Sequence, residues 1–421
     1  MDLKNLNIHI RKLEEMDNSE NLFDLRKAIY YEELRNIPLD SIVEKDDKKA
    51  IHILAYYADE LIGALRLLPA IDSELLQNEN QMEGAVWCVA RLMIKKSFRG
   101  TSLASLLMYF MSSFLRNQEC EKLVTFYPKD HHYSTKKVYR AKPLNIIRHH
   151  KFDNGTDVDI QLHHFPEIEW LAYKSFSGLG SDSWRKIAIE QAGIPFIKDF
   201  ILKRITQIYT NLWFQKVRQK TLSLDQYIDT LGNNLKFVQW TTKILAKVAS
   251  VTSDRALRNH YLVHLRGKVD HDLWIEEDLE YLGADVKYYR DHKVPDPAIA
   301  DFMNCQESLV SHYRYPVHFM ALPLTIEGFT AFWQPTDMES LKDCARVWGY
   351  SDTAKATKFY SSHIQTDGKA EVGHWHQTFK LLPSYVSSEY DISKMYQIAS
   401  CVSSAIDRAF ERFASKKSLS L

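Results

Sequence analysis

The spacing of hydrophobic positions changes along the chain, and the change predicts two kinds of domain. Residues 1 to about 165 alternate between strand-like segments and amphipathic helices. Turn signals at 58–60 and at Asn154–Gly155 join neighbouring strands into hairpins. This order predicts an α/β domain, with strands at 8–14, 52–57, 61–68, 85–94, 122–128, 145–152 and 157–165 and helices at 19–35 and 103–117.

The strand pattern stops after about residue 185, and apolar positions then recur at helical spacing. Gly283, Pro295 and Pro335 fall in the breaks between these segments. An all-α bundle is therefore expected, with helices at 196–218, 223–250, 252–282, 297–332, 338–347, 353–381 and 390–414. The Ser/Gly-rich stretch 175–183 is the expected linker, which gives domains at 1–174 and 185–421.

Charge and cysteine content narrow the function classes. The 54 basic and 54 acidic residues balance, with no basic stripe, so a nucleic-acid partner is not expected. The five cysteines are scattered and form no Cys-x-x-Cys, as in a protein of a reducing compartment. No apolar run approaches the roughly 18 residues of a membrane span, and the N-terminus lacks an apolar leader. A cytoplasmic location is therefore expected.

A candidate phosphate-binding turn lies between residues 91 and 107. A predicted strand ends there, a turn containing Arg99 and Gly100 follows, and a predicted helix begins. The free N–H groups and positive dipole of a helix start can hold a phosphate. The alternative is an ordinary strand–helix turn with a surface arginine.

This region resembles the GNAT acyltransferase superfamily, whose acyl-CoA loop reads R/Q-x-x-G-x-G/A. Arg99 and Ala104 match the ends of that pattern, and Ser102 stands at its central glycine. The stretch 30–69 and the segment 86–94 also resemble acyl-homoserine-lactone autoinducer synthases and related long-chain N-acyl synthases, which share Arg66 and Arg91. The resemblance implies an acyl-CoA or acyl-carrier-protein donor held by Arg99, Gly100, Thr101, Ser102, Leu103 and Ala104.

Direct attack of an amine on an acyl thioester requires a base and an acid. Glu33 is the candidate base, with a surface or capping role as the alternative, and Tyr139 is the candidate acid, with a core role as the alternative. Arg66 and Arg91 are the candidate substrate-binding residues. For Arg66, a structural ion pair with the acidic run 44–47 explains the sequence equally well.

The helical half carries a pattern of metal-ligand residues. His260, His264 and His271 are spaced i, i+4 and i+11 on one expected helix, and His363, Asp367 and His374 repeat the spacing on another. Glu327 lies in an otherwise apolar run, where a carboxylate is costly unless paired or metal-bound. Imidazole and carboxylate ligands without cysteine favour iron or manganese. The alternative is that these histidines are satisfied core residues or face solvent.

At these residues the chain resembles haem-oxygenase-like non-haem iron enzymes. That family carries E-x6-H, a Glu-Gly helix and H-x3-D-x2-H; here these are His264-x6-His271, Glu327-Gly328 and His363-x3-Asp367. His264 stands where the family has Glu, and Ala370 where it has the last His, with His374 one turn beyond. The resemblance implies one or two irons, O₂ as co-substrate and oxidation of a small amine, amino acid or fatty acid. The expected metal ligands are His264, His271, Glu327, His363, Asp367 and His374.

Three functions fit the sequence. The first is a bifunctional enzyme that acylates an amine and performs an Fe/O₂ oxidation. The second is an acyltransferase whose helical half is a degenerate, metal-free scaffold, as the replacements at His264 and Ala370 suggest. The third is a non-enzymatic binding protein, for which Ser102 and Cys88 would mark a decayed acyltransferase. A homodimer and an acyl-carrier-protein partner are left open.

Overall fold

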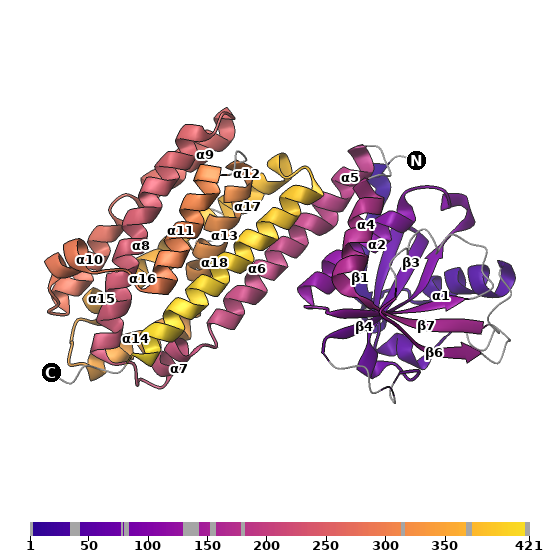
Figure 1. Cartoon of the computed structure of the whole chain (residues 1–421), viewed down its shortest axis with the longest axis horizontal. Coiled ribbons are helices and arrows are strands. Elements are labelled where there is room, and N and C mark those ends of the chain that lie inside the picture. The colour runs from indigo at the N-terminus through magenta and orange to yellow at the C-terminus, as the bar shows by residue number, and fades with distance from the viewer. Residues whose placement is uncertain are drawn as a thin grey trace. The chain divides into compact units, whose positions relative to one another are not determined.

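The computed structural model separates the chain into two compact units (Figure 1). Unit 1 comprises Met1–Phe196 with Ser387–Glu389, and unit 2 comprises Ile197–Val386 with Tyr390–Leu421. The sequence placed the change of domain at 174–185, whereas the structural division falls at Phe196, inside a helix. The residues that the structure describes are 3–33, 43–76, 79, 84–128, 143–151, 157–177, 182–312, 316–367 and 373–416.

Unit 1 is built on one mixed sheet, which confirms the α/β prediction. Its described strands are β1 (Leu6–Lys12), β2 (Ile51–Tyr57), β3 (Glu60–Pro69), β4 (Val86–Ile94), β5 (Lys122–Pro128), β6 (Asn145–Lys151) and β7 (Asp157–His164). They lie in the order β1-β2-β3-β4-β5-β7-β6. Neighbouring strands run antiparallel, apart from the central parallel pair β4 and β5. The expected Asn154–Gly155 turn between β6 and β7 lies outside the described residues.

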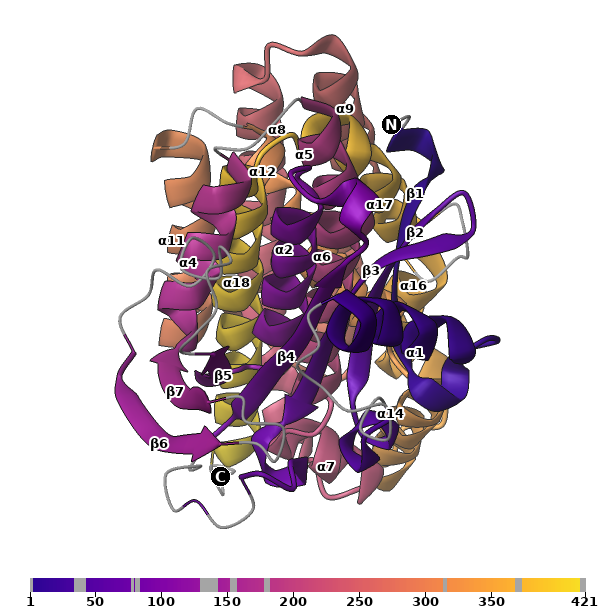
Figure 2. The same ribbon diagram turned by 90° about the vertical axis from the view of Figure 1, so that its right-hand side faces the viewer.

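The helices of unit 1 cover this sheet (Figure 2). α1 (Glu20–Arg26) continues as a π-helical stretch, Lys27–Glu33. α2 (Leu103–Asn117) packs on β2, β3 and β4 and buries almost its whole surface. α4 (Phe165–Ser177) and α5 (Asp182–Ala188) follow, with α4 against α2. The sequence prediction missed α4, whose buried positions Ile168 and Ala172 form only a short apolar stripe.

A β-bulge interrupts the ladder between β3 and β4. Ala64 pairs with Met93 and Arg66 with Ala90, so two residues of β4 face one residue of β3. Arg91 is one of the two and has a left-handed φ of 56°. A bulge bends the strand and redirects its side chains. Here it places Arg91 beside the acidic run at 44–47.

The described part of unit 2 consists of helices and the turns that join them, with no strand, which confirms the predicted bundle. Its helices are α6 (Ile194–Ile208, across the unit boundary), α7 (Leu212–Arg218), α8 (Leu224–Val251), α9 (Arg255–Lys268), α10 (His271–Tyr281), α11 (Pro297–His312), α12 (Pro316–Phe319), α13 (Ala321–Ala331), α14 (Pro335–Val347), α15 (Thr353–Ala356), α16 (Lys358–Asp367), α17 (His374–Tyr385) and α18 (Glu389–Ser415, with its first residue in unit 1).

An aromatic cluster fills part of the core of unit 2. Trp213 is fully buried, lies 5.1 Å from the ring of Phe410 and 6.1 Å from that of Trp333, and donates its indole N–H to Thr230 at 3.2 Å. Phe329 joins the cluster from α13, the helix that also carries Glu327. The cluster therefore anchors one wall of the candidate metal site.

Four of the expected helices are divided into shorter ones, namely 196–218, 252–282, 297–332 and 353–381, and the divisions of two of them separate candidate ligands. The segment 252–282 divides at Asp270, which has a left-handed φ of 73°, so α9 ends at Lys268 and α10 starts at His271. The segment 353–381 divides into α15, α16 and α17. The prediction that each histidine row lies on one face of one helix is therefore wrong.

None of the described helices combines the length and the apolar character that crossing a membrane requires.

Candidate metal centre and acyl-transfer site

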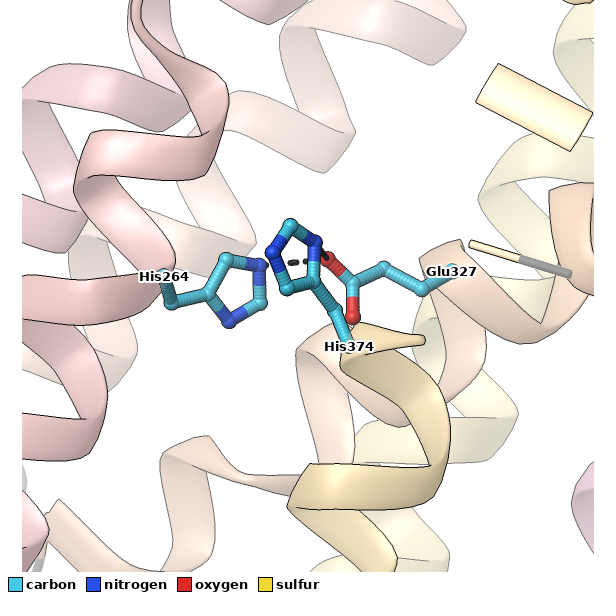
Figure 3. A group of neighbouring side chains, drawn as sticks. All are labelled: His264, Glu327 and His374. Carbon is cyan, nitrogen blue, oxygen red and sulfur yellow. Dashed lines mark ion pairs between the residues drawn. The ribbon is translucent and has the colours of Figure 1, made fainter. Parts of the chain in front are cut away.

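Three helices of unit 2 bring His264, Glu327 and His374 together (Figure 3). His264 comes from α9, Glu327 from α13 and His374 from the first turn of α17. One ligand atom from each lies within 4.8 Å of the other two. His264 and His374 are 110 positions apart in the sequence, so the group exists only when the bundle is folded.

Glu327 is the centre of the group. Its side chain is 1% exposed. Its Oε1 contacts His264 Nε2 and lies 3.6 Å from His374 Nδ1. The two imidazole rings stack at a centroid distance of 4.9 Å and an angle of 22°. Two imidazoles, one buried and one partly exposed, thus converge on a buried carboxylate.

Two glycines allow this close approach. A Cβ at Gly267 of α9 would lie 2.6 Å from His374 Cε1, so only glycine leaves room for that ring. A Cβ at Gly328, beside Glu327, would lie 2.7 Å from Ile205 Cδ1 and 2.9 Å from Trp375 Nε1. Trp375 in turn donates its indole N–H to the Leu324 carbonyl at 2.9 Å, which ties α17 to α13.

A lysine enters the same group. Lys268, one helical turn after His264, places its ammonium Nζ 3.0 Å from Glu327 Oε1. Lys268 is absent from the predicted site because the prediction rested on imidazole and carboxylate ligands alone. The i+4 spacing from His264 was a signal that could have found it.

His271 and His363 form a separate buried pair. His271 Nδ1 lies 2.9 Å from His363 Nε2, and His363 Nδ1 donates to the Phe359 carbonyl at 3.0 Å. His363 Nε2 is then the acceptor and His271 Nδ1 the donor, since a neutral imidazole carries one N–H. Trp274 stacks on His271 at 4.1 Å.

Asp278 connects the helices that carry this pair. On α10, its carboxyl oxygens accept the backbone N–H groups of Lys358 and Phe359 at 3.0 and 3.1 Å, at the start of α16. Burial raises the pKa of Asp278 to about 8.

His260 lies one turn before His264. Its Nε2 is 3.3 Å from Thr378 Oγ1, and that hydroxyl donates to the His374 carbonyl at 2.9 Å. Burial, with a smaller contribution from His264, lowers the pKa of His260 to about 4, so the ring is neutral near pH 7.

The predicted ligand set is thus divided. The structure gathers His264, Glu327 and His374, and places His271 and His363 in their own pair. Asp367 ends α16, but its side chain lies outside the described part, as does Ala370. The regrouping follows from the helix breaks, because His374 belongs to a different helix from His363.

The donor atoms of the central group suit a divalent metal. Two imidazoles and a carboxylate are the set found in non-haem iron(II) oxygenases. Ligands about 2.1 Å from one metal lie about 3 Å apart when adjacent, close to the 3.6 Å between His374 Nδ1 and Glu327 Oε1. The residues present therefore fit one iron.

In unit 1, Arg99 binds Glu33. Arg99 Nη1 contacts Glu33 Oε1, and its Nη2 donates to Oε2 at 2.7 Å. The Arg99 guanidinium holds the pKa of the Glu33 carboxyl below its usual range. The candidate donor-binding residue and the candidate base are therefore partners in this state.

The loop between β4 and α2 forms a tight turn. Gly100 has a φ of 78°, a conformation that favours glycine. Thr101 donates its hydroxyl to the Phe98 carbonyl at 2.7 Å and accepts the Leu103 N–H at 3.3 Å. Ser102 is the residue before α2. Ala104 lies in the first turn of α2, so the predicted strand–turn–helix is present.

Arg66 and Arg91 belong to a charge network. Asp47 accepts Arg26 at 2.7 and 2.9 Å and Arg66 at 3.0 Å, while Glu44 contacts both Arg66 and Arg91. Three guanidiniums against two carboxylates leave one formal positive charge. The ion pair of Arg66 with the acidic run, which was the alternative interpretation, is therefore present.

Three further residues are placed as follows. Tyr139, the candidate acid, lies outside the described residues. Cys88 is buried on β4, and burial raises the pKa of its thiol to about 12. His163 on β7 is fully buried, and its Nε2 lies 3.1 Å from Thr125 Oγ1.

A family model, the acetyltransferase (GNAT) family, matches residues 13–142. The matched residues lie within unit 1, whose mixed sheet has the GNAT fold. Among solved structures, the CoA-dependent acyl-homoserine lactone synthase BjaI, with SAM and isopentyl-CoA, is 18% identical; the match covers 42% of this chain and 91% of BjaI at a TM-score of 0.33.

Other solved structures match the helical part. A domain of unknown function with a haem oxygenase-like fold from Shewanella denitrificans is 15% identical over 51% of this chain and 88% of its own, at a TM-score of 0.44. A TenA homologue from Pseudomonas syringae pv. tomato is 14% identical over 55% of this chain and 92% of its own, at a TM-score of 0.42. No curated protein sequence matched the chain significantly.

Proposed function

We propose that the chain is a bifunctional biosynthetic enzyme. Its GNAT domain transfers an acyl group from an acyl-CoA or acyl-carrier thioester to an amine. Its helical domain binds iron and uses O₂ to oxidise a small amine, amino acid or fatty-acyl substrate. The observation that carries the second activity is the convergence of His264 and His374 on the buried Glu327 carboxylate.

In the helical domain, the Glu327 carboxylate and the imidazoles of His264 and His374 would hold one iron. Bound iron(II) supplies redox chemistry toward O₂ and leaves coordination positions for substrate. The buried walls around Glu327 exclude bulk water. The His271–His363 pair and Asp367 remain candidates for a second metal, supported by the ligand types alone.

In the GNAT domain, the loop amides at 99–104 and Arg99 would hold the phosphates of the donor. Donor phosphate and the Glu33 carboxylate compete for the same guanidinium. Donor binding would thus release Glu33, whose pKa would rise, and let it accept a proton from the attacking amine. The leaving thiolate takes a proton from an acid, the role proposed for Tyr139. The surplus positive charge around Arg66 and Arg91 supports an acceptor that bears a carboxylate.

Iron content tests the oxidase half. Protein loaded anaerobically with iron(II) should hold about one equivalent and melt higher than the metal-free form. Glu327→Ala and His264→Ala should lose the iron. His318→Ala is the matched control, because His318 is equally buried in unit 2 and pairs with Asp391 at 2.8 Å. It should lower stability but keep the metal. Wild-type protein without stoichiometric iron would remove this half of the proposal.

Donor kinetics test the acyltransferase half. Arg99→Ala should raise the KM for the acyl donor and leave that for the acceptor amine near its wild-type value. Lys95→Ala is the control, since Lys95 lies on the same loop and pairs instead with the exposed Glu60. An unchanged donor KM in Arg99→Ala would place the donor phosphates elsewhere.

A second candidate is an acyltransferase with a metal-free helical scaffold. The contact at 3.0 Å between Lys268 and Glu327 favours it, because an ammonium already compensates the buried carboxylate. Iron analysis separates the two candidates.

A further inference from the structure

Lys268 approaches the oxygen that is central to the candidate metal site. Its Nζ lies 3.0 Å from Glu327 Oε1, and this same atom contacts His264 Nε2 and lies 3.6 Å from His374 Nδ1. The Lys268 side chain is 10% exposed and that of Glu327 1%. The ammonium therefore contacts the same carboxylate oxygen that the two imidazoles approach.

A divalent cation and this ammonium would be close neighbours. A metal binds a carboxylate oxygen at about 2.1 Å, and Nζ lies 3.0 Å from that oxygen. The two positive centres could then be no more than about 5 Å apart. Buried like charges at this distance repel strongly, since little solvent screens them.

We propose that Lys268 is a built-in competitor for the metal and sets the affinity of the site. In the metal-free protein its ammonium occupies Glu327. When a divalent cation binds, the ammonium leaves that oxygen, and the cost of this exchange weakens metal binding. The proposal rests on the metal site of the proposed function.

The position of Lys268 permits the exchange. It is the last residue of α9, next to the break at 269–270, and Val269 beside it is 53% exposed. A lysine has a flexible four-carbon stem that can carry its charge toward water while the stem stays packed. The wild type can thus hold either cation at Glu327.

Cobalt(II) titration of the purified full-length chain tests this role. Cobalt(II) gives a visible absorption band that reports ligand number directly, without any catalytic assay. Lys268→Met should bind cobalt(II) at least about tenfold more tightly than wild type, and Lys268→Gln should do the same. Lys268→Arg, which keeps the charge, should bind no more tightly than wild type.

Lys293→Met is the matched control. Lys293 also lies in unit 2 and forms a half-buried ion pair with Asp229 on α8, with side-chain exposures of 16% and 15%. Its loss should lower the melting temperature without changing cobalt affinity. An effect as large as that of Lys268→Met would show a general response to lost charge and overturn the proposal.

The outcomes separate this proposal from the one on which it rests. Equal cobalt affinity in wild type, Lys268→Met and Lys268→Gln would refute the competitor role and leave the metal site standing. Tighter cobalt binding in the two uncharged variants than in wild type, lost when His264→Ala is added, would support both. No binding in any variant, with native circular dichroism, would refute the metal site and the competitor role together.

Discussion

The replacement of Gly267 by alanine isolates the contact between α9 and His374. The added methyl group would lie 2.6 Å from His374 Cε1 and 2.7 Å from Nε2, so the ring must move. Overpacking of this kind costs roughly 1–3 kcal/mol. Alanine in a helix interior gains roughly 0.5–1 kcal/mol over glycine. The sum ranges from no change to a loss of about 2.5 kcal/mol.

A double-mutant cycle removes this ambiguity. In a His374→Ala background the clash is absent, so Gly267→Ala should stabilise the protein by roughly 0.5–1 kcal/mol. The coupling between the two sites should therefore be about 1–3 kcal/mol. Urea denaturation followed by far-ultraviolet circular dichroism measures all four variants. If Gly267→Ala stabilises both backgrounds equally, His374 does not pack against Gly267, and the arrangement of α9 and α17 is wrong.

Two further predictions concern unit 1. Asp47→Ala leaves the fully buried Arg26 without its bidentate partner and should lower the free energy of unfolding by about 3–5 kcal/mol in denaturation experiments. The control Glu60→Ala breaks an exposed pair with Lys95 and should lower it by less than about 1 kcal/mol. Burial lowers the pKa of His52 to about 4, so the unfolded chain takes up a proton first as the pH falls through 6.5. Stability should decline between pH 6.5 and 4 by roughly 3 kcal/mol from this group. Melting curves of His52→Gln should show a shallower decline, and an identical pH profile would rule His52 out as the source.

The pattern of apolar residues predicted correctly those strands and helices that consist of one continuous apolar run. The strand 122–128 and the helix 103–117 have the predicted boundaries, because turn residues or charges flank both runs. The burial of Glu327 also followed from its apolar neighbours. α4 was missed because a Ser/Gly-rich segment overlaps its last turn and suggested a linker.

The candidate site was harder to predict, because its members meet through tertiary packing. Periodicity gives no warning of a left-handed residue such as Asp270, since aspartate also occurs within helices. Because the chain breaks at Asp270, His271 begins a new helix. Because the segment 353–381 is divided, His374 lies on a separate helix, where its ring packs against Gly267 of α9. Which histidine faces Glu327 depends on those breaks. Lys268 could be placed only once the direction of α9 relative to α13 was known.

The distribution of tryptophan gives the chain its own optical reporters. Six of the nine tryptophans, residues 213, 240, 274, 333, 348 and 375, belong to unit 2. Trp213 and Trp333 lie within the aromatic cluster, so their fixed rings should give a strong near-ultraviolet circular dichroism band. Trp375 lies directly beside His374, and Trp274 stacks on His271. Their fluorescence should therefore respond separately to events at the two histidine groups, and each can be removed singly to assign the signal.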